Sequence, residues 1–454
     1  MKQMTKFTLA IITVWLLSAC GTTTSSSGND SSHSGSTSGS TSHNGVEATK
    51  AYFGDKVNNK IVVVDVENMK WIKDIPTGNK VSYAAEVIKT QASEHNLNPK
   101  LYVDNRGSNS IDVIDSATNT IIKTIPLTFY PRSITVQEIT GLVAVSGTNK
   151  AMVAIIDSAT DTVIATVGNN IVTQPTTSGH SYVSSGTLAS GHPHWLDQNH
   201  FVVIDRQNKK IDTYKLTKNM DGSWSTALLN SLTTPSPVHD LIPPKVHGQE
   251  HSNVNSTIFY ATAEGATDIY PSILKLTFNV TTGLSITEEL QLQATGYTAN
   301  QMGLHHLNFL KNQNTIYAGS HEGTLFVVDY SRSPMSVTKT VKAGIGAGHA
   351  DEASHINMAV IINHKDTFIT LMNTSTNTKI ADIVVSELTA SQITGQTQSH
   401  PAYHFSKDGR YFYLFLTQEG AMVKVDLTTK TVVGRLKLGG ELAMGAFIQA
   451  STGQ

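Results

Sequence analysis

Short apolar runs separated by polar turns fill the chain from about residue 50 to its end. In the clearest units an apolar run ends in Asp, a turn of Ser, Thr and Asn follows, and a second β-branched run begins. These units lie at 60–66, 110–125 and 152–162, with later copies at 325–329 and 422–431. Asp and Thr side chains bond backbone groups in tight turns. The pattern therefore predicts a chain of β-hairpins.

The hairpin units recur at a spacing of roughly 40 to 50 residues, which is the period of a β-propeller blade. We predict an all-β fold, a single propeller of about eight four-stranded blades, with seven as the alternative because the segment 355–394 is irregular. The last segment, 442–450, has no partner in its own unit, so we expect it to complete the first blade and close the ring. The predicted third strands of the blades lie near Val62, Val113, Ala154, Ile211, Leu274, Phe326, Ile380 and Val423.

The unit Ile-Asp-Ser-Ala-Thr-Asn-Thr at 114–120, followed by Ile-Ile-Lys-Thr-Ile, resembles the YVTN-type β-propeller repeats of surface and periplasmic proteins. The resemblance extends from residue 50 to about residue 438. It implies a propeller fold and says little about activity, because propellers host many functions.

The first residues predict export and anchoring rather than structure. Lys2 and Lys6 precede an apolar run at 7–17 that is too short to span a bilayer, and small residues lead to Cys20, the only cysteine. The segment 17–20 resembles a bacterial lipobox with Cys20 as the lipidated residue. We predict a lipoprotein signal at 1–19, a flexible Ser/Gly/Thr-rich tether at 20–46 and the propeller at 47–454. The protein is then held in the bacterial cell envelope by a lipid anchor, with the outer membrane or the periplasmic face favoured.

Charge and cysteine content narrow the possible partners. The chain has 33 Lys and Arg against 35 Asp and Glu, so there is no basic excess to bind a nucleic-acid backbone. A single cysteine excludes a thiolate metal site within one chain. Histidine is abundant instead, since 15 of the 18 histidines lie between His180 and His404.

Several of these histidines fall at one place in a repeat. The segments 246–257, 304–315 and 399–410 have equal length, and each runs through a polar turn into a strand. His247, His305 and His400 therefore occupy equivalent positions, and a shorter copy at 191–197 holds His192 and His194. The first strand of a propeller blade lines the central channel. We expect these imidazoles to converge on one mouth of that channel.

Neighbouring histidines extend the predicted set. His349 and His355 precede the apolar run 356–360, which we expect to be the first strand of another blade. His404 lies four residues after His400, so both share one face of a strand. His306 is adjacent to His305, and on a regular strand only one of the two can face the channel.

Imidazoles gathered around an axis predict a metal site. Zinc takes three or four N or O ligands, and imidazole also suits copper, so zinc is our first choice and copper the second. Asp197 is the favoured carboxylate, and Glu250, Asp351 and Glu352 are further candidates. His239 is a possible second-site ligand. We expect four histidines in or beside turns to be surface residues, and these are His95, His200, His321 and His364.

Three functions fit this pattern. A tethered propeller with a histidine-lined mouth, including His192-Pro193-His194, resembles periplasmic zinc metallochaperones of the AztD type. That resemblance implies transfer of zinc to the solute-binding protein of an ABC importer. The second reading is a copper- or zinc-dependent enzyme, because the pair His305-His306 resembles the copper cluster of nitrous oxide reductase, although the cysteines of its electron-transfer domain are missing here. The third is a metal-free protein-binding scaffold.

Overall fold

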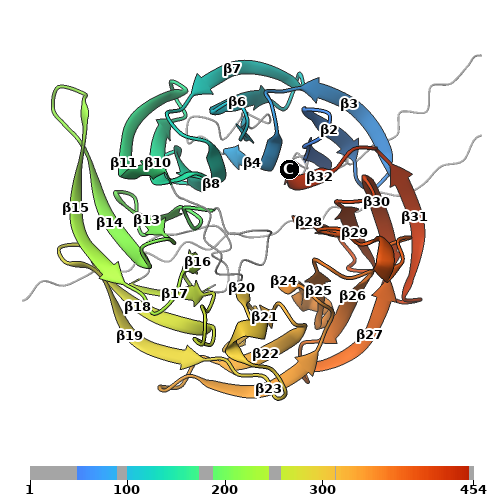
Figure 1. The fold of residues 1–454 in the computed structure, drawn as a ribbon. Coiled ribbons are helices and arrows are strands. Elements are labelled where there is room, and N and C mark those ends of the chain that lie inside the picture. The colour runs from blue at the N-terminus through green and yellow to red at the C-terminus, as the bar shows by residue number, and fades with distance from the viewer. Residues whose placement is uncertain (1–48, 89–99, 173–187, 245–256, 312, 449–454) are drawn as a thin grey trace, which may run out of the picture. The chain divides into compact units, whose positions relative to one another are not determined.

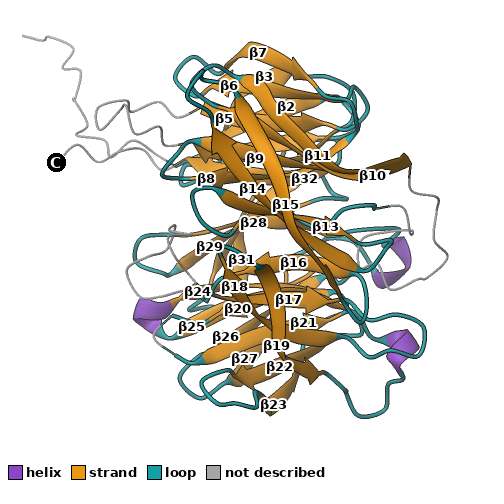
Figure 2. Cartoon of the chain, turned by 90° about the vertical axis from the view of Figure 1, so that its left-hand side faces the viewer, coloured by secondary structure: helices purple, strands orange, loops and turns teal. Residues whose placement is uncertain are grey.

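The computed structural model describes residues 49–448, except 89–99, 173–187, 245–256 and 312. Eight four-stranded antiparallel sheets follow one another around a central axis (Figure 1). The predicted count of eight blades is therefore confirmed. Figure 2 shows the same ring from the side, with three short 3₁₀ turns, η1 (Ala299–Gln301), η2 (Ser354–Ile356) and η3 (Ala390–Gln392), in the described chain.

Each blade consists of an inner strand, two middle strands and an outer strand. Blades 1 to 4 contain β32 (Leu442–Ile448), β1 (Lys50–Asp55), β2 (Lys60–Asp65) and β3 (Lys70–Pro76); β4 (Val81–Ile88), β5 (Lys100–Asn105), β6 (Ser110–Asp115) and β7 (Thr120–Pro126); β8 (Pro131–Gln137), β9 (Leu142–Gly147), β10 (Lys150–Asp157) and β11 (Thr162–Val172); and β12 (His194–Trp195), β13 (His200–Asp205), β14 (Lys210–Lys218) and β15 (Trp224–Thr233). Blades 5 to 8 contain β16 (Val238–Ile242), β17 (Ile258–Ala263), β18 (Ser272–Asn279) and β19 (Gly283–Gln291); β20 (Leu304–Phe309), β21 (Thr315–Ser320), β22 (Thr324–Asp329) and β23 (Ser336–Lys342); β24 (Ala347–Ala353), β25 (Met358–Asn363), β26 (Phe368–Asn373) and β27 (Thr378–Val384); and β28 (Gln398–Phe405), β29 (Tyr411–Leu416), β30 (Ala421–Asp426) and β31 (Thr431–Lys437).

Burial explains the unbroken apolar runs of the middle strands. In β2 the four residues 61–64 are all buried, because each face of the sheet packs against a neighbouring blade. The outer strand β3 is mostly exposed or half-buried. Continuous apolar runs are expected where both faces of a strand are covered.

The Asp residues that end the middle strands stabilise the following turns by hydrogen bonds, as predicted. Oδ1 of Asp115 accepts hydrogen bonds from the backbone N–H groups of Ala117 and Thr118. Oδ1 of Asp426 does the same for Thr428 and Thr429. These bonds satisfy turn amides that have no partner in the ladder.

The C-terminal strand closes the ring as the sequence predicts. β32 pairs antiparallel with β1, from Lys50 opposite Ile448 to Asp55 opposite Leu442. Phe53 of β1 stacks on Phe415 of blade 8, with ring centroids 3.5 Å apart. Two chain segments almost 400 residues apart in sequence thereby complete blade 1 and its interface with blade 8.

Two strand predictions were wrong. In blade 7 the inner strand is β24, so the run 356–360 belongs largely to the second strand, β25, and Ile380 lies in the outer strand β27 rather than the third. In blade 5 the inner strand β16 ends at Ile242, before His247. The segment 246–252 therefore follows the inner strand and lies outside the described residues.

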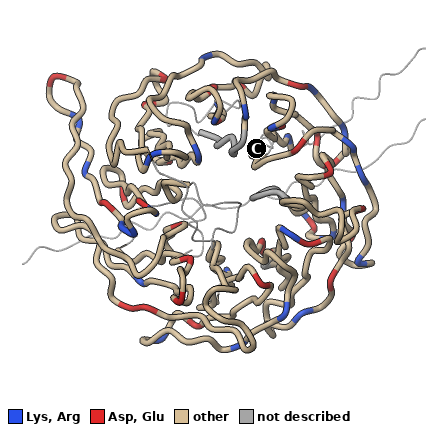
Figure 3. The backbone as a smooth tube through the Cα atoms, viewed as in Figure 1, with Lys and Arg blue, Asp and Glu red and all other residues tan. Residues whose placement is uncertain are grey.

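The described chain carries a mixed surface and no membrane-spanning helix. Figure 3 shows Lys and Arg interspersed with Asp and Glu around the outer strands. Among the described residues no helix is long and apolar enough to cross a bilayer. Residues 1–48, with the predicted signal and Cys20, lie outside the described part.

We predict that Phe53→Ala destabilises the closed ring. Phe53 is fully buried between blades 1 and 8, so its removal leaves a cavity and should lower the free energy of unfolding by about 3–5 kcal/mol. Val433→Ala in β31 is the control, because Val433 is 51% exposed and its truncation should change stability by less than about 0.5 kcal/mol. Urea unfolding measures both, and equal effects would contradict this account of closure.

Candidate metal centre

The inner strands bulge where they begin, and the bulges carry histidines. In blades 5 and 6 the inner strand advances three residues while its partner advances two, so one extra residue enters the strand. The pairs that flank the extra residue are Val238 with Ala263 and Leu241 with Ala261, and Leu304 with Ser320 and Leu307 with Ala318. The bulged dipeptides are His239-Asp240 and His305-His306. A β-bulge interrupts the alternation of side chains between faces, which explains how adjacent His305 and His306 both join one cluster.

The same position recurs in successive blades. The first residue of each inner segment pairs with the last residue of the second strand, and the residue two places later is polar. In blades 3 to 8 this residue is Ser133, His192, Asp240, His306, His349 and His400. The propeller thus brings one register position from many blades to the same mouth of the channel. Figure 1 shows β16, β20 and β24 side by side at this centre.

Six buried imidazoles meet there, from His192, His239, His305, His306, His349 and His364. Their ring centroids form an unbroken chain of contacts, from 4.1 Å between His306 and His349 to 5.4 Å between His305 and His364. None of the six is more than 8% exposed. Blades 4 to 7 each contribute at least one ring.

A carboxylate orients His239. Nδ1 of His239 lies 2.7 Å from Oε1 of Glu264, and the other oxygen of Glu264 accepts from the Arg206 guanidinium. A carboxylate held by Arg only accepts, so Nδ1 carries the hydrogen and Nε2 is left with the lone pair. Nε2 of His239 is buried and has no hydrogen-bond partner in the described part of the chain. A buried, unpartnered ring nitrogen is costly unless it serves a ligand.

A second carboxylate ties two blades together. Oδ2 of Asp240 lies 2.9 Å from Nδ1 of His306, and Oδ1 lies 2.6 Å from Nε2 of His194. Burial alone would raise the pKa of Asp240, but the charges and hydrogen bonds of His194 and His306 outweigh burial and hold that pKa well below its ordinary value. An ionised Asp240 accepts from both rings, which leaves the lone pair of His306 on Nε2, where a metal could bind.

Two further rings are oriented by neutral groups. Nδ1 of His192 lies 2.7 Å from Oγ of Ser133 in blade 3, and Nδ1 of His364 donates to the carbonyl of Gln398 in blade 8 at 3.0 Å. Gly348 leaves space beside the cluster, since a Cβ there would lie 2.6 Å from Nδ1 of His305 and 2.9 Å from Nε2 of His364. The absence of a side chain at residue 348 therefore lets two ring nitrogens face the same small space.

Burial keeps most of these imidazoles neutral. It lowers the pKa of His192, His239 and His349 well below the ordinary value, and electrostatic interaction with a neighbour, Arg132 for His192 and the His306 ring for the other two, lowers the pKa further. Burial also lowers the pKa of His364, to about 3. Neutral imidazole is the form that binds metal, so these rings need not lose a proton at neutral pH.

Two groups of three histidines have the spacing of a metal site. They are His192 with His239 and His306, and His305 with His306 and His349, and within each group the ligand nitrogens lie within 4.8 Å of one another. Imidazole donors with carboxylates behind them resemble the usual design of zinc ligands, in which the second ring nitrogen donates to a carboxylate or carbonyl. The residues present therefore fit a divalent ion of the zinc or copper type.

The structure brings four of the predicted ligands into the cluster, namely His192, His305, His306 and His349. His194 contacts it through Asp240. His355 is exposed in η2, beyond the end of β24, and His404 pairs with Glu67 of blade 1 at 3.2 Å. His400 lies in the inner strand β28 at the equivalent register, but its side chain is outside the described ones, as is all of His247. For all the predicted ligands, metal binding stays a prediction.

The carboxylates that touch the cluster are not the favoured ones. Asp197 accepts hydrogen bonds from Nδ1 of His200 and from backbone amides in its own turn. Asp351 and Glu352 lie further along β24, where Glu352 accepts from the amide of Lys311, and Glu250 lies outside the described residues. Asp240 and Glu264 instead orient the rings.

Two histidines expected at the surface are buried. His364 follows β25 in a turn and is only 1% exposed, because the turn packs over the cluster. His200 begins β13 and is 5% exposed against Phe278. His321 is half-buried, and His95 lies outside the described residues. The turn that carries His364 faces the channel. The sequence shows that His364 lies in a turn, but it does not show which way that turn faces.

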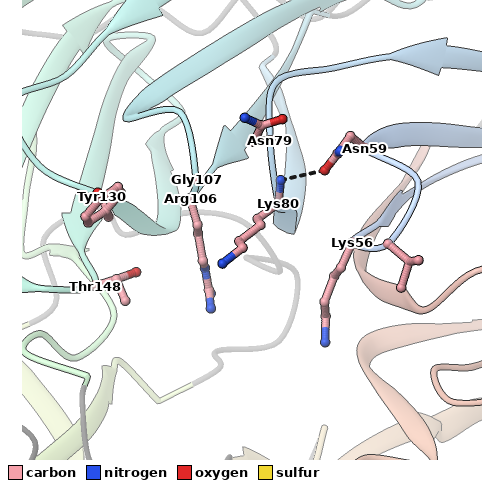
Figure 4. Close-up of a pocket in the computed structure, with 9 residues that line it drawn as sticks. Lys56, Asn59, Asn79, Lys80, Arg106, Gly107, Tyr130 and Thr148 are labelled. Atoms are coloured by element: carbon pink, nitrogen blue, oxygen red, sulfur yellow. Dashed lines mark hydrogen bonds between the residues drawn. The ribbon is translucent and has the colours of Figure 1, made fainter.

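A cationic cavity opens on the same face of the propeller. It has a volume of about 620 Å³. Part of its lining comes from the turns that join the two middle strands of blades 1 to 3, the same kind of turn that carries Arg206, Glu264 and His364. The rest, including Lys80 and Tyr130, comes from the connections that lead from an outer strand to the inner strand of the next blade. Lys56, Lys80 and Arg106 extend into it (Figure 4). Lys56 pairs with Glu441 and Arg106 with Asp104, whereas Lys80 has no ion pair among the described residues.

Comparison with known proteins shows the fold and no more. No family model matches the chain, and no curated protein matches it. Among solved structures, dihydro-heme d1 dehydrogenase NirN is similar over 87% of this chain and 74% of its own, with 11% identity and a TM-score of 0.58. AztD from Citrobacter koseri is similar over 87% of this chain and 97% of its own, with 11% identity and a TM-score of 0.54. Sqt1 from Saccharomyces cerevisiae is similar over 80% and 87%, with 10% identity and a TM-score of 0.56. All three share the β-propeller fold with this chain.

We predict that Asp240→Asn weakens metal binding. An amide cannot accept from His194 and His306 as a carboxylate does, so the ring of His306 loses its orientation and the affinity should fall by about 10- to 100-fold. Competition titration with a zinc chelator measures the change. Asp197→Asn is the matched control, since Asp197 bonds its own turn, and it should leave the affinity unchanged. A larger loss for Asp197→Asn than for Asp240→Asn would show that the site lies elsewhere.

Proposed function

We propose that this protein is a metal carrier of the cell envelope, with zinc as its cargo and copper as the second choice. The cluster of six buried histidines carries the proposal. Burying so many imidazoles forfeits their hydration, and a bound ion compensates by accepting their lone pairs. The fold shared with AztD supports the proposal, as does the sequence resemblance to zinc metallochaperones of that type.

The nature of the ligands suits a carrier of zinc. Three imidazoles form a neutral ligand set that binds a divalent ion without thiolates, which agrees with an oxidising compartment and a single cysteine. The predicted lipid anchor at Cys20 would keep the propeller at the membrane surface. The acceptor would then be a metal-binding protein of the same compartment, such as the solute-binding protein of an ABC importer.

Positive charge on the face of the propeller that holds the cluster suggests that the acceptor carries an acidic patch. The cationic cavity of Lys56, Lys80 and Arg106 is lined by turns of blades 1 to 3, on the same face of the propeller as the cluster. An acceptor with an acidic patch beside its own metal site would be steered to this face, because complementary charge speeds encounter more than it raises affinity.

We expect untagged protein to bind zinc in a manner that depends on His306. Elemental analysis after zinc loading and gel filtration should find bound zinc in the unaltered chain and almost none in His306→Gln, because His306 belongs to both groups of three. His355→Gln is the matched control and should retain full zinc, since His355 is exposed outside the cluster. An unaltered chain that binds neither zinc nor copper would rule out the carrier function and favour a metal-free scaffold.

We expect transfer to depend on the cationic cavity. Zinc should leave the protein faster in the presence of a metal-free acceptor than it dissociates into excess chelator. The pair Lys80→Glu and Arg106→Glu should slow the transfer and reduce its dependence on salt, with the equilibrium affinity for zinc unchanged. Stopped-flow measurement with a fluorescent zinc indicator follows the rate. Loss of zinc at the same rate with acceptor and with chelator would contradict a carrier role.

A further inference from the structure

The two groups of three histidines share one member. His306 stands between His192 and His239 on one side and His305 and His349 on the other, with ring centroids 5.2, 4.8, 4.3 and 4.1 Å from its own. His192 and His239 belong to blades 4 and 5, whereas His349 belongs to blade 7. His306 is thus the only residue common to both groups in the described part of the chain.

His306 can offer only one nitrogen. Its Nδ1 lies 2.9 Å from Oδ2 of Asp240, and Asp240 is itself fixed by His194 at 2.6 Å. A carboxylate oxygen accepts, so Nδ1 of His306 keeps its hydrogen and the lone pair available to a metal is on Nε2. One lone pair makes one metal bond. The two groups therefore cannot both be complete at the same time.

Electrostatics also opposes double occupancy. Two divalent ions on either side of one imidazole would repel four times as strongly as two unit charges at that distance, in a buried site of low dielectric constant. The carboxylates that contact the cluster, Asp240 and Glu264, are each already bound to two partners, Glu264 to Arg206 and His239. They lie behind the rings, on the nitrogens that do not face the metal.

We infer that the cluster holds one ion at a time in two alternative positions, His192–His239–His306 and His305–His306–His349, and that the ion passes between them while it stays bound to His306. The inference rests on the proposed metal-binding function. The ion in transit exchanges His192 and His239 for His305 and His349 and keeps one bond throughout, so no step requires a bare ion in the protein interior. Zinc accommodates a fifth ligand during such an exchange.

The path continues toward blade 7. His364 contacts both His305 and His349, with ring centroids 5.4 and 5.2 Å away, and its Nε2 faces the space beside Gly348. The second position thus has a further imidazole within reach. A methyl group at residue 348 would occupy the space between Nδ1 of His305 and Nε2 of His364, so it would act on the second position directly, through His305.

Metal stoichiometry in the full-length untagged chain tests the inference. With zinc as the probe, we expect one ion per unaltered chain, one ion in His192→Gln and one ion in His349→Gln, because each variant loses only one position. With cobalt as the probe, the visible absorption bands of the two variants should differ, since the ion then sits among different rings. Gly348→Ala should resemble His349→Gln in its cobalt spectrum, and Gly395→Ala, where a Cβ meets no atom within 4 Å, should resemble the unaltered protein.

The outcomes separate this inference from the function on which it rests. An unaltered chain that binds no zinc or copper overturns both. Two ions per unaltered chain would keep the metal-binding function and overturn the shared ligand. A single fixed site would show itself as complete loss of zinc binding in one of the two variants, His192→Gln or His349→Gln, and full zinc binding in the other. That result would also overturn the inference. Gly348→Ala complements the histidine variants, because it changes the space of the second position without removing a ligand.

Discussion

Closure of the ring is the constraint on which the site depends. β32 pairs with β1, and the Phe53–Phe415 stack packs blade 1 against blade 8. A closed ring fixes the separation of the inner strands, because none of the eight sheets can rotate outward without breaking two interfaces. Histidines that are more than 170 residues apart in sequence, such as His192 and His364, are held beside the same axis for this reason. An open arc of blades would leave them independent.

In the closed ring, the β-bulges of the inner strands determine which side chains come into contact. A regular strand would send only one of His305 and His306 toward the channel, and the extra residue at the start of β20 brings both rings into the cluster. The same irregularity in β16 places Asp240 at the register of His306. One blade therefore supplies the carboxylate that orients the imidazole of the next. The Ser133 hydroxyl and the Gln398 carbonyl orient histidines of the neighbouring blade in the same way, between blades 3 and 4 and between blades 7 and 8.

Much of the fold could be predicted from the hairpin pattern, because Asp-ended apolar strands and their turns obey local rules. The inner strand of blade 7, β24, was not predicted. It contains Gly348-His349 and two acidic residues, so its sequence lacks the pattern of an apolar strand. The structure places four predicted ligands together, but the equal spacing that suggested His247 did not locate the inner strand of blade 5, which ends at Ile242. In blade 5 the connection from Ile242 to Ile258 is longer than the corresponding one in blade 6, so the equivalent histidine lies earlier.

The signal for that earlier histidine was present in the sequence. Val-His-Asp-Leu at 238–241 aligns with Leu-His-His-Leu at 304–307, and this alignment would have identified both His239 and Asp240. No comparable signal marks His364 or Glu264, which lie in or beside turns between the middle strands. Whether such a turn faces the channel or the solvent depends on how the blades pack, and the local sequence does not encode this.

We infer that histidines of successive blades bind one metal ion within the channel. X-ray absorption at the zinc edge of the zinc-loaded, untagged chain tests it directly. The account predicts a first shell of nitrogen or oxygen at about 2.0–2.1 Å with the outer-shell scattering of at least three imidazole rings. A shell of oxygen without imidazole scattering would place the ion elsewhere and contradict the claim.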